Sequence, residues 1–413
     1  EKEVVVTATP AREGVVNIAY ATWMWEARQK IVDETIRRFE EKYPLIRLEL
    51  QGYPWGEYFD KITTLIAADA APDVVHVWVD QAQPFIQGGF AVNLEPYIVR
   101  DAFDVSIFPD CIDIARYKGD LYGFPRDGGT FSDRNIYYNR DLFREAGVPF
   151  PDSQPKDPNK GWTWDEFLEA AKALTVDANG DGKVDQWGML PALDAFQVYP
   201  MIWSNGGDLI DEQGTKCLLD GPEAVEAIQM LADLRLVHKV SPYPEDVEGL
   251  GDIFMTGQCA MRHGPVMYGN SLKDVGVEFD WSIADYPRMK AGVINLAVTH
   301  PILITTASPH PDAAWEWLKY TVSFENQYFQ AVEMVGFPPQ TVPVARLDEW
   351  LNRDEPPYDY SPFAYGATKT IPKVVQWRRI VTEILQPELE PVWLGTATAE
   401  EATSVICDKM NKL

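Results

Sequence analysis

Long apolar runs are absent from this sequence. No stretch of about 18 apolar residues occurs, and a helix needs roughly that length to cross a bilayer. A basic segment followed by an apolar one, the pattern of an export signal, is also missing from the first residues. We therefore expect any export signal to have been removed from this numbering. The polar stretch 1–14 is predicted to be a tether between a membrane anchor and the first lobe, although the end of a cytoplasmic chain would look the same.

Cysteine is scarce. The four cysteines, at 111, 217, 259 and 407, show no CxxC spacing and have no nearby histidine pairs, which argues against a thiolate metal site. In an exported protein one or two disulfides can form, and four cysteines allow three pairings that the sequence does not separate. Free buried thiols are the alternative.

Positive charge is in deficit. The chain has 36 Lys and Arg against 63 Asp and Glu, a formal net charge of -27. The resulting field repels nucleic acid, phosphate-rich ligands and anionic membrane surfaces, so we expect no nucleic-acid partner. A neutral ligand or a cation is easier to accommodate. The simpler interpretation is that the acidic surface keeps an exported protein in solution.

Catalytic motifs are missing as well. The sequence contains no GxSxG, HExxH or GxxxxGK, and no GxGxxG after the first strand. We therefore expect no enzyme. The alternative is a glycosidase that uses a pair of carboxylates, for example Asp80 with Asp127.

What the chain does contain predicts an α/β fold in two lobes. At 413 residues it is too long for one ordinary core. The segments 15–21 and 46–50 have strand-like patterns, and each is followed by a segment whose apolar residues recur at helical spacing. The segment 73–78 is almost continuously apolar. A strand that is buried on both faces of a parallel sheet has this character. The alternation predicts a parallel sheet with crossover helices.

The stretch 121–174 marks the passage from one lobe to the other. Arg126, Asp127 and two glycines, Gly128 and Gly129, follow a short strand and suit a hinge. Further on, Thr163-Trp-Asp-Glu166 is a capping box, which predicts the start of an amphipathic helix.

Several sequence segments, in the order in which that family has them, resemble the family 1 extracellular solute-binding proteins of ABC importers. This is the class that contains the maltose-binding proteins. The segments are GFP at 123–125, IYYNRDLFREAGVPFP at 136–151, TWDEFLEAAKAL at 163–174, APDVVHVWVD at 71–80, SNGGDLIDEQG at 204–214 and GQCAMRHGP at 257–265. The resemblance implies the type II periplasmic-binding-protein fold, with two mainly parallel sheets flanked by helices and a multi-strand hinge. It places lobe 1 at 15–126 and 296–337, and lobe 2 at 127–295 and 338–413. It also implies a third crossing near 336–341, a helix over 311–335 and terminal helices near 372–385 and 399–410.

Aromatic residues at the ends of strands are predicted to stack on the ligand, and we call them the predicted plates. A sugar presents flat C–H faces and a rim of hydroxyls, which aromatic rings and planar polar groups match. The predicted plates are Trp23, Trp25, Trp55, Trp78, Trp203 and Trp377. The predicted polar partners are Asp80, Arg126, Asp127 and Asn205, and the ligand-binding set also includes Gly206, Tyr268 and His300.

Each of these residues also has a structural interpretation. Large aromatics more often pack in a core. Asp80 can cap a helix, Arg126 can pair with Asp127 across the hinge, Asn205 can serve the following turn, and His300 can be structural.

A turn rich in Asp and Gly follows the capped helix. Asp177, Asn179, Asp181 and Asp185 stand at positions 1, 3, 5 and 9 of a calcium-loop pattern, with Lys183 at position 7 and glycine at 6, but position 12 is Gly188 rather than glutamate. A structural calcium ion is one interpretation and an empty polar turn is the other. No cofactor is expected to be required.

The resemblance implies a monomeric, exported solute-binding component, periplasmic or on the cell surface; lipid anchoring is one alternative and a protein without a lipid anchor is the other. It would close around a sugar or oligosaccharide in the cleft between its lobes and deliver it to the permease subunits of an ABC importer. The alternatives are a binding protein for another solute, such as a polyol phosphate or a peptide, and a carbohydrate-active enzyme.

Overall fold

The computed structural model describes residues 14–128, 131–334 and 338–413. The chain forms two compact units: unit 1 contains Glu1–Thr130 and Val298–Leu347, and unit 2 contains Phe131–Ala297 and Asp348–Leu413. The resemblance placed the corresponding boundaries at 126/127, 295/296 and 337/338, whereas the compact units change at 130/131, 297/298 and 347/348. The predicted tether up to residue 13, Gly129 of the predicted hinge and the start of the predicted third crossing at 336–337 lie outside the described residues.

Unit 1 is built on a five-stranded sheet with the order β2-β1-β3-β12-β6. Its strands are β1 (Val16–Trp23), β2 (Ile46–Tyr53), β3 (Val74–His76), β6 (Gly123–Asp127) and β12 (His300–Ile304). β1 pairs in parallel with β2 and with β3, while β12 is antiparallel to both β3 and β6. The predicted parallel strands with crossover helices are confirmed here, and β12 returns from far along the chain to complete the sheet.

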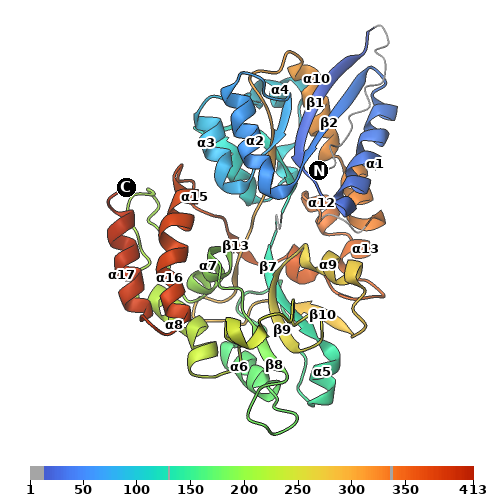
Figure 1. Cartoon of the computed structure of the whole chain (residues 1–413). Coiled ribbons are helices and arrows are strands. Elements are labelled where there is room, and N and C mark those ends of the chain that lie inside the picture. Colours follow the sequence, from blue (N-terminus) through green and yellow to red (C-terminus); the bar gives the residue numbers. More distant parts are fainter. Residues whose placement is uncertain (1–13, 129–130, 335–337) are drawn as a thin grey trace. The chain divides into compact units, whose positions relative to one another are not determined.

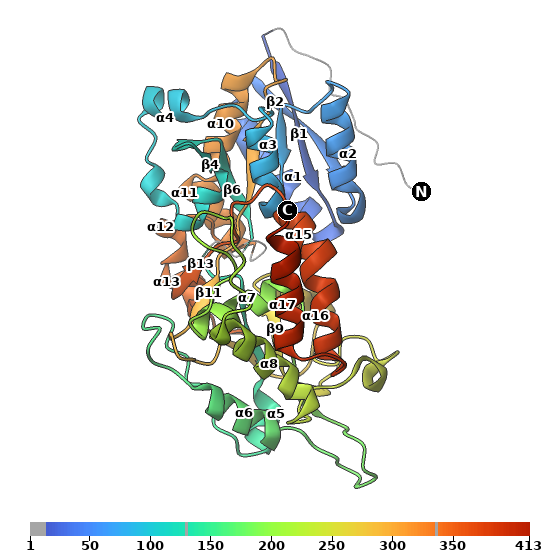
Figure 2. The same cartoon turned by 90° about the vertical axis from the view of Figure 1, so that its left-hand side faces the viewer.

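The helices of unit 1 surround this sheet, and α10 lies among the N-terminal elements in both views (Figures 1 and 2). They are α1 (Glu26–Lys42), α2 (Trp55–Ala67), α3 (Ala82–Gln87), α4 (Glu95–Asp101), α10 (Pro311–Thr321), α11 (Phe324–Tyr328) and α12 (Val342–Ala345). Shorter elements are η1 (Val79–Gln81), η2 (Val105–Ile107), η3 (Asp110–Ala115), the π-helical turn η5 (Phe329–Glu333) and the hairpin of β4 (Arg116–Tyr117) and β5 (Asp120–Leu121). The single helix predicted over 311–335 is therefore interrupted, because Ser323 caps a new helix by accepting a hydrogen bond from the Asn326 amide.

Aromatic side chains from α10 fill the core of unit 1. Trp317 lies with its ring centroid 5.4 Å from that of Tyr20 and 5.0 Å from that of Phe39. Trp315 lies 5.3 Å from Phe124. Edge-on and tilted aromatic contacts of this kind add to the free energy gained by burying the rings, so they fix α10 against β1, β6 and α1.

Unit 2 contains a four-stranded sheet with the order β10-β7-β9-β8 and a two-stranded sheet of β11 and β13. In the larger sheet β8 and β9 are parallel, while β7 is antiparallel to β9 and β10. The strands are β7 (Arg134–Asn139), β8 (Trp187–Leu190), β9 (Cys259–Pro265), β10 (Trp281–Ala284), β11 (Ile294–Leu296) and β13 (Ala367–Lys369).

The helices of unit 2 include the capped helix and the terminal helix at their predicted positions. Thr163 and Glu166 form the predicted capping box, and Phe167, Leu168 and Ala171 behind it are buried. The helices are α5 (Arg140–Glu145), α6 (Trp164–Ala173), α7 (Ala195–Ser204), α8 (Pro222–Leu236), α9 (Tyr268–Val275), α13 (Asp348–Leu351), α14 (Ser361–Ala364), α15 (Trp377–Ile380), α16 (Gln386–Trp393) and α17 (Ala399–Met410), with short turns at η4 (Pro244–Val247) and η6 (Val381–Leu385).

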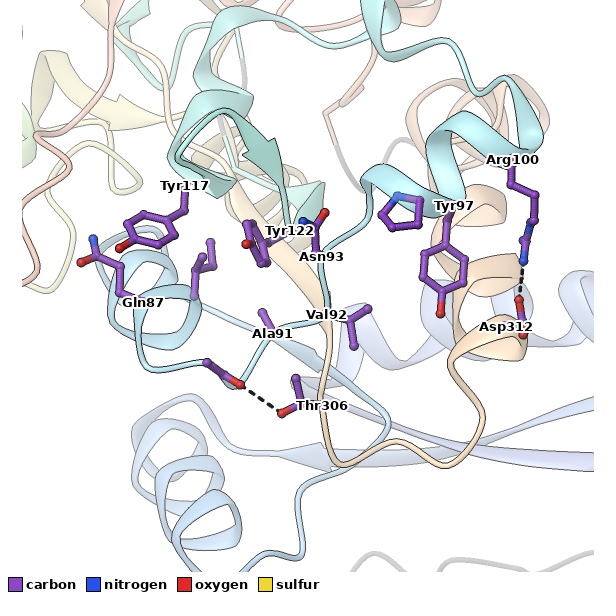
Figure 3. A pocket seen from close by; sticks show the side chains of 13 residues that line it. Gln87, Ala91, Val92, Asn93, Tyr97, Arg100, Tyr117, Tyr122, Thr306 and Asp312 are labelled. Carbon is purple, nitrogen blue, oxygen red and sulfur yellow. Dashed lines mark hydrogen bonds and ion pairs between the residues drawn. The ribbon is translucent and has the colours of Figure 1, made fainter.

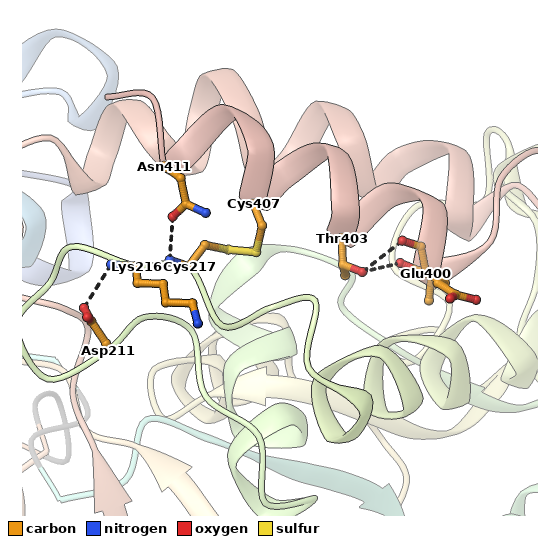
Figure 4. Close-up of a disulfide and its surroundings, with 8 residues drawn as sticks. Asp211, Lys216, Cys217, Glu400, Thr403, Cys407 and Asn411 are labelled. Atoms are coloured by element: carbon orange, nitrogen blue, oxygen red, sulfur yellow. Dashed lines mark hydrogen bonds between the residues drawn. A yellow bond between two sulfur atoms is a disulfide. The ribbon is translucent and has the colours of Figure 1, made fainter.

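One disulfide joins distant parts of unit 2. Cys217 is bonded to Cys407 of α17, 190 residues away in sequence (Figure 4). The Cys217 amide also donates to the Asn411 side chain at 2.9 Å. Cys111 and Cys259 are buried and are not part of this disulfide, so the structure selects one pairing and leaves two buried thiols.

Candidate functional site

Four aromatic residues and two histidines meet at one edge of the unit 1 sheet. β1, β2, β3 and β6 all end there. β12 begins there, and its first residue, His300, pairs with Asp127 at the end of β6. We call this cluster the aromatic edge, and its members are Trp23, Trp55, Phe59, Trp78, His76 and His300. Ligands of open α/β sheets bind outside the carboxyl ends of the strands, so the topology places the cluster where a ligand is expected.

The rings of the aromatic edge are arranged in two stacked pairs. Trp23 lies on His76 with centroids 3.7 Å apart, and Trp78 lies on His300 at 3.6 Å. Trp55 meets Trp23 and Trp78 edge-on, at 5.1 and 4.6 Å. The rings therefore support one another, and each is held in a fixed plane.

Part of this cluster faces solvent. Trp55 is 46% exposed, and Trp25 beside the cluster is 44% exposed, whereas Trp23 is 2% exposed. Trp78 is half-buried. The exposed Trp55 indole packs edge-on against the buried Trp23 ring, and it therefore offers an apolar ring surface that a flat ligand can stack on.

A buried polar network lies against this layer. Arg28, at the start of α1, forms an ion pair with Asp127, and its guanidinium carbon lies 5.2 Å from the Trp23 ring centroid. Arg28 also donates to the Thr22 hydroxyl at 3.2 Å. The His76 Nε2 atom lies 3.2 Å from the Asp127 carboxylate and 3.0 Å from the His300 carbonyl oxygen. Both charged side chains of the ion pair are buried, and each compensates the charge of the other.

The surroundings of His76 fix its tautomer and its charge. Its Nε2 atom faces only acceptors, whereas its Nδ1 atom lies 3.0 Å from the Thr22 hydroxyl and 3.3 Å from the Arg28 guanidinium. The proton therefore belongs on Nε2. Burial lowers the pKa of His76 to about 4, although Asp127 acts in the opposite direction. His76 is neutral at pH 7, and the pKa of Asp127 lies well below its usual value because the nearby His76 and Arg28 outweigh the effect of burial.

The low pKa of His76 makes the stability of unit 1 depend on pH. Because the pKa is about 4 in the folded chain and 6.5 in the unfolded one, the unfolded state binds the proton more tightly. The contribution of His76 is thus present above pH 6.5 and is lost as the pH falls through about 4. We expect the free energy of unfolding to fall by about 3 kcal/mol between pH 7 and pH 4 because of this group. In urea unfolding the variant His76→Gln should show a smaller decrease; an unchanged decrease would contradict the assignment.

The structure brings together most of the residues predicted in unit 1. Trp23, Trp55, Trp78 and His300 lie in the aromatic edge, and Asp127 lies against it. Arg126 is buried next to Asp127 in β6. Asp80 is half-buried in the turn η1, and that turn has no side-chain cap at its N-terminus.

The sequence interpretation missed Thr22, Arg28, Phe59 and His76. A signal for His76 was present, because it is the one polar residue in the apolar run VVHVWV, and buried polar groups need partners. For Arg28 there was no comparable signal, since its partner Asp127 is 99 positions away in the chain.

The predicted residues of unit 2 lie mainly in its interior. Trp203 is 2% exposed inside α7, and its Nε1 atom donates to Asp208 at 2.9 Å. Trp377 is 1% exposed at the start of α15. Both indoles are placed in helices that pack into the core of unit 2, rather than in loops at strand ends.

The other predicted residues of unit 2 have structural partners. The Asn205 amide donates to the Glu223 carbonyl and to the Glu226 carboxylate, both at 2.8 Å. Gly206 follows with a φ of 94°, which suits the turn after α7. Tyr268 is buried, and its hydroxyl donates to Asp252 at 3.0 Å. These contacts do not test ligand binding, so the roles of these residues stay predictions.

The Asp/Gly-rich turn at 177–185 uses its oxygen atoms within the loop. Asp177 accepts from the amides of Gly180 and Gly182 at 2.7 and 2.9 Å. Asp185 accepts from the Ala178 amide at 2.8 Å. Among the described residues no group of three or more His, Cys, Asp or Glu is placed to hold a metal ion. The calcium interpretation gains no support from this arrangement and stays a prediction.

Known proteins resemble this chain over most of its length. The family described as bacterial extracellular solute-binding protein matches residues 25–328. A putative binding protein of Brucella abortus is 26% identical over 373 residues, which cover 88% of this chain and 84% of that protein. The sn-glycerol-3-phosphate-binding periplasmic protein UgpB of Salmonella typhimurium is 24% identical over 422 residues, covering 93% of this chain and 89% of that protein.

A solved structure shows the same fold. The ABC substrate-binding protein Lmo0181 of Listeria monocytogenes, determined in complex with cycloalternan, has a TM-score of 0.82 and 27% identity, covering 96% of this chain and 98% of that one. Within the described part of this chain, no helix is both long and apolar enough to cross a membrane. The family match spans well over half of the sequence, and the chain therefore belongs to the bacterial extracellular solute-binding proteins, the binding components of ABC importers.

Proposed function

We propose that the chain binds a neutral sugar or oligosaccharide at the aromatic edge. The observation that carries this proposal is the pair of exposed indoles, Trp25 and Trp55, beside stacked rings that hold Trp78 in place. The C–H face of a pyranose stacks on such a surface, and the neighbouring polar groups can meet its hydroxyls. The Listeria protein of the same fold was determined with an oligosaccharide, cycloalternan, which supports the same ligand class.

The charges at the site favour a neutral ligand. The guanidinium of Arg28 is paired with Asp127, so its charge is already compensated. The formal net charge of -27 repels anions over a longer range. A sugar carries no charge and meets neither obstacle.

A phosphate ester of a polyol is the second candidate. It is favoured by the match to the sn-glycerol-3-phosphate-binding protein, which extends over 93% of this chain. Arg28 and Arg126 both lie near the edge, and arginine is the usual partner of phosphate. For phosphate to bind Arg28, however, it must compete with the buried carboxylate of Asp127.

Asp127 is a poor general acid for a glycosidase. A general acid must hold its proton near the working pH. The pKa of Asp127 lies well below its usual value, so this carboxyl stays ionised and cannot donate a proton. The proposal is therefore binding without cleavage.

The transport role rests on the family. Solute-binding proteins of this kind close around the ligand by a hinge motion and then dock on a membrane permease, and we propose that this chain does the same as an exported monomer. The ligand stabilises the closed form through contacts that the open form lacks. Small-angle scattering with and without ligand tests the closure: a smaller radius of gyration is expected, and an unchanged one in the presence of bound ligand would contradict it.

A thermal-shift panel tests the ligand class. The ligands are maltose, maltotriose, cellobiose, sn-glycerol 3-phosphate and trialanine, each at increasing concentration. At about 100 times Kd a ligand adds about 2.7 kcal/mol of stability, which raises Tm by roughly 5–10 °C for a unit of this size. We expect at least one saccharide to give such a shift and to be recovered uncleaved by chromatography. A shift with glycerol phosphate alone would replace the proposal with the second candidate, and a cleaved saccharide would establish an enzyme.

A further inference from the structure

A second concave site lies in unit 1, away from the aromatic edge. It is a pocket of about 850 Å³ between the segment around α4, the hairpin of β4 and β5, and the segment that leads from β12 into α10 (Figure 3). Its lining includes Gln87, Asn93, Tyr97, Tyr117, Tyr122 and Thr306. We call it the tyrosine pocket.

The strand directions separate the two sites. β12 begins with His300 at the aromatic edge and runs antiparallel to β3. Thr306, which lines the tyrosine pocket, comes after the last residue of β12, Ile304. Ala91, another lining residue, forms a bridge with Thr305. The tyrosine pocket therefore lies at the opposite ends of the strands of the same sheet. A ligand in it does not touch the indoles of the aromatic edge.

Three aromatic rings are spread along the pocket. Tyr97, Tyr117 and Tyr122 are half-buried; Tyr97 comes from α4, and Tyr117 and Tyr122 come from the hairpin of β4 and β5, Tyr122 directly after β5 (Figure 3). Tyr97 is supported by Trp315 of the core, with ring centroids 5.6 Å apart. Half-buried tyrosines offer both a ring face for stacking and a hydroxyl for hydrogen bonding.

The polar lining carries no uncompensated charge. Arg100 and Asp312, the two charged residues of the lining, form an ion pair at 2.5 Å. The remaining polar side chains of the lining are neutral. The exposed Gln87 amide donates to Gln83 at 3.0 Å, the Asn93 amide donates to the Asp120 carboxylate at 2.6 Å, and the Thr306 hydroxyl donates to the Gly89 carbonyl at 3.1 Å. Amides and hydroxyls between aromatic rings suit a ligand rich in hydroxyl groups, and the paired charges give no advantage to an ionic one.

We propose that the tyrosine pocket binds a short neutral oligosaccharide. Its volume falls in the usual range of about 300–1,000 Å³ for small-molecule sites. The inference goes beyond the proposed function, because this second site is separate from the aromatic edge and lies entirely within unit 1. It gives the chain a place to hold a saccharide without any movement of unit 2.

The test removes the first site and then probes the second. Maltotriose, cellotriose and isomaltotriose are titrated into Trp55→Ala/Trp78→Ala by calorimetry, with hydrogen exchange as the second readout. We expect residual binding of at least one trisaccharide and protection of residues 86–97 and 116–122. Tyr117→Ala or Tyr122→Ala in this background should weaken the residual binding at least tenfold.

Two further variants control for folding. Tyr328→Ala removes a half-buried tyrosine of the same unit that does not line the pocket and should leave the residual binding unchanged. Gln87→Ala changes an exposed lining residue and should weaken binding even if a tyrosine variant fails to fold. The proposal is overturned if no trisaccharide binds to the background protein, or if residual binding is insensitive to Tyr117, Tyr122 and Gln87. Binding at the aromatic edge is measured independently, by comparing the wild type with Trp55→Ala, so failure of one site does not imply failure of the other.

Discussion

Replacing Arg28 with methionine lowers the free energy of unfolding of unit 1 by about 3–5 kcal/mol. The arginine side chain is 0% exposed and its partner Asp127 is 7% exposed. Methionine leaves the carboxylate buried without its positive partner, and an uncompensated buried charge is strongly destabilising. Hydrogen exchange of peptides from β1 and β3, read by mass spectrometry, reports the opening free energy of this unit separately from unit 2.

Arg37 of the same helix is the matched control. Its side chain is 53% exposed and pairs with Glu34 and Glu41. Exposed ion pairs contribute little, so Arg37→Met should cost less than about 1 kcal/mol. The double variant Arg28→Met/Asp127→Asn should be more stable than Arg28→Met alone, because both charges are then gone. Equal costs for Arg28→Met and Arg37→Met would contradict the buried network.

Trp55→Ala weakens the binding of a neutral saccharide about 30-fold or more. Central aromatic residues of a binding surface commonly contribute about 2 kcal/mol or more to affinity, and this free energy corresponds to such a factor. The indole is 46% exposed, so its removal leaves the fold largely intact and the loss appears in Kd. Calorimetric titration with the saccharide that gives the largest thermal shift measures it.

Trp164 provides the control for this prediction. It is half-buried at the start of α6 in unit 2, and Trp164→Ala should leave Kd unchanged. Trp55→Phe keeps an aromatic face and should lose only part of the affinity. If Trp55→Ala and Trp164→Ala bind equally well, the exposed indole is not part of the ligand site.

Local signals in the sequence predicted much of the fold. The capping box at Thr163 fixed the start of α6, and α17 covers the predicted range 399–410. Both depend on patterns within a few residues of each other. The antiparallel pairing of β12 depends on contacts with strands far away in the sequence, so no local pattern predicted it. The break before α11 depends on the cap at Ser323, which the helical pattern of 311–335 concealed.

The candidate site was predicted in part. Strand ends located Trp23, Trp55 and Trp78 because parallel strands deliver their carboxyl ends to one edge. The same reasoning placed Trp203 and Trp377 at strand ends, yet both belong to helices whose inner faces pack in unit 2. An indole satisfies the requirements of a core as well as those of a ligand plate, and the sequence pattern around these two residues does not distinguish them. The pairing of the disulfide could not be predicted from the sequence either, since its cysteines are 190 residues apart.

Hydrogen exchange of the wild-type protein with and without a bound saccharide tests the central claim most directly. Binding at the aromatic edge predicts slower exchange in the segments that carry its residues, 22–28, 53–59 and 76–81. Slower exchange confined to other segments, with these three unchanged while the saccharide is bound, would contradict the account.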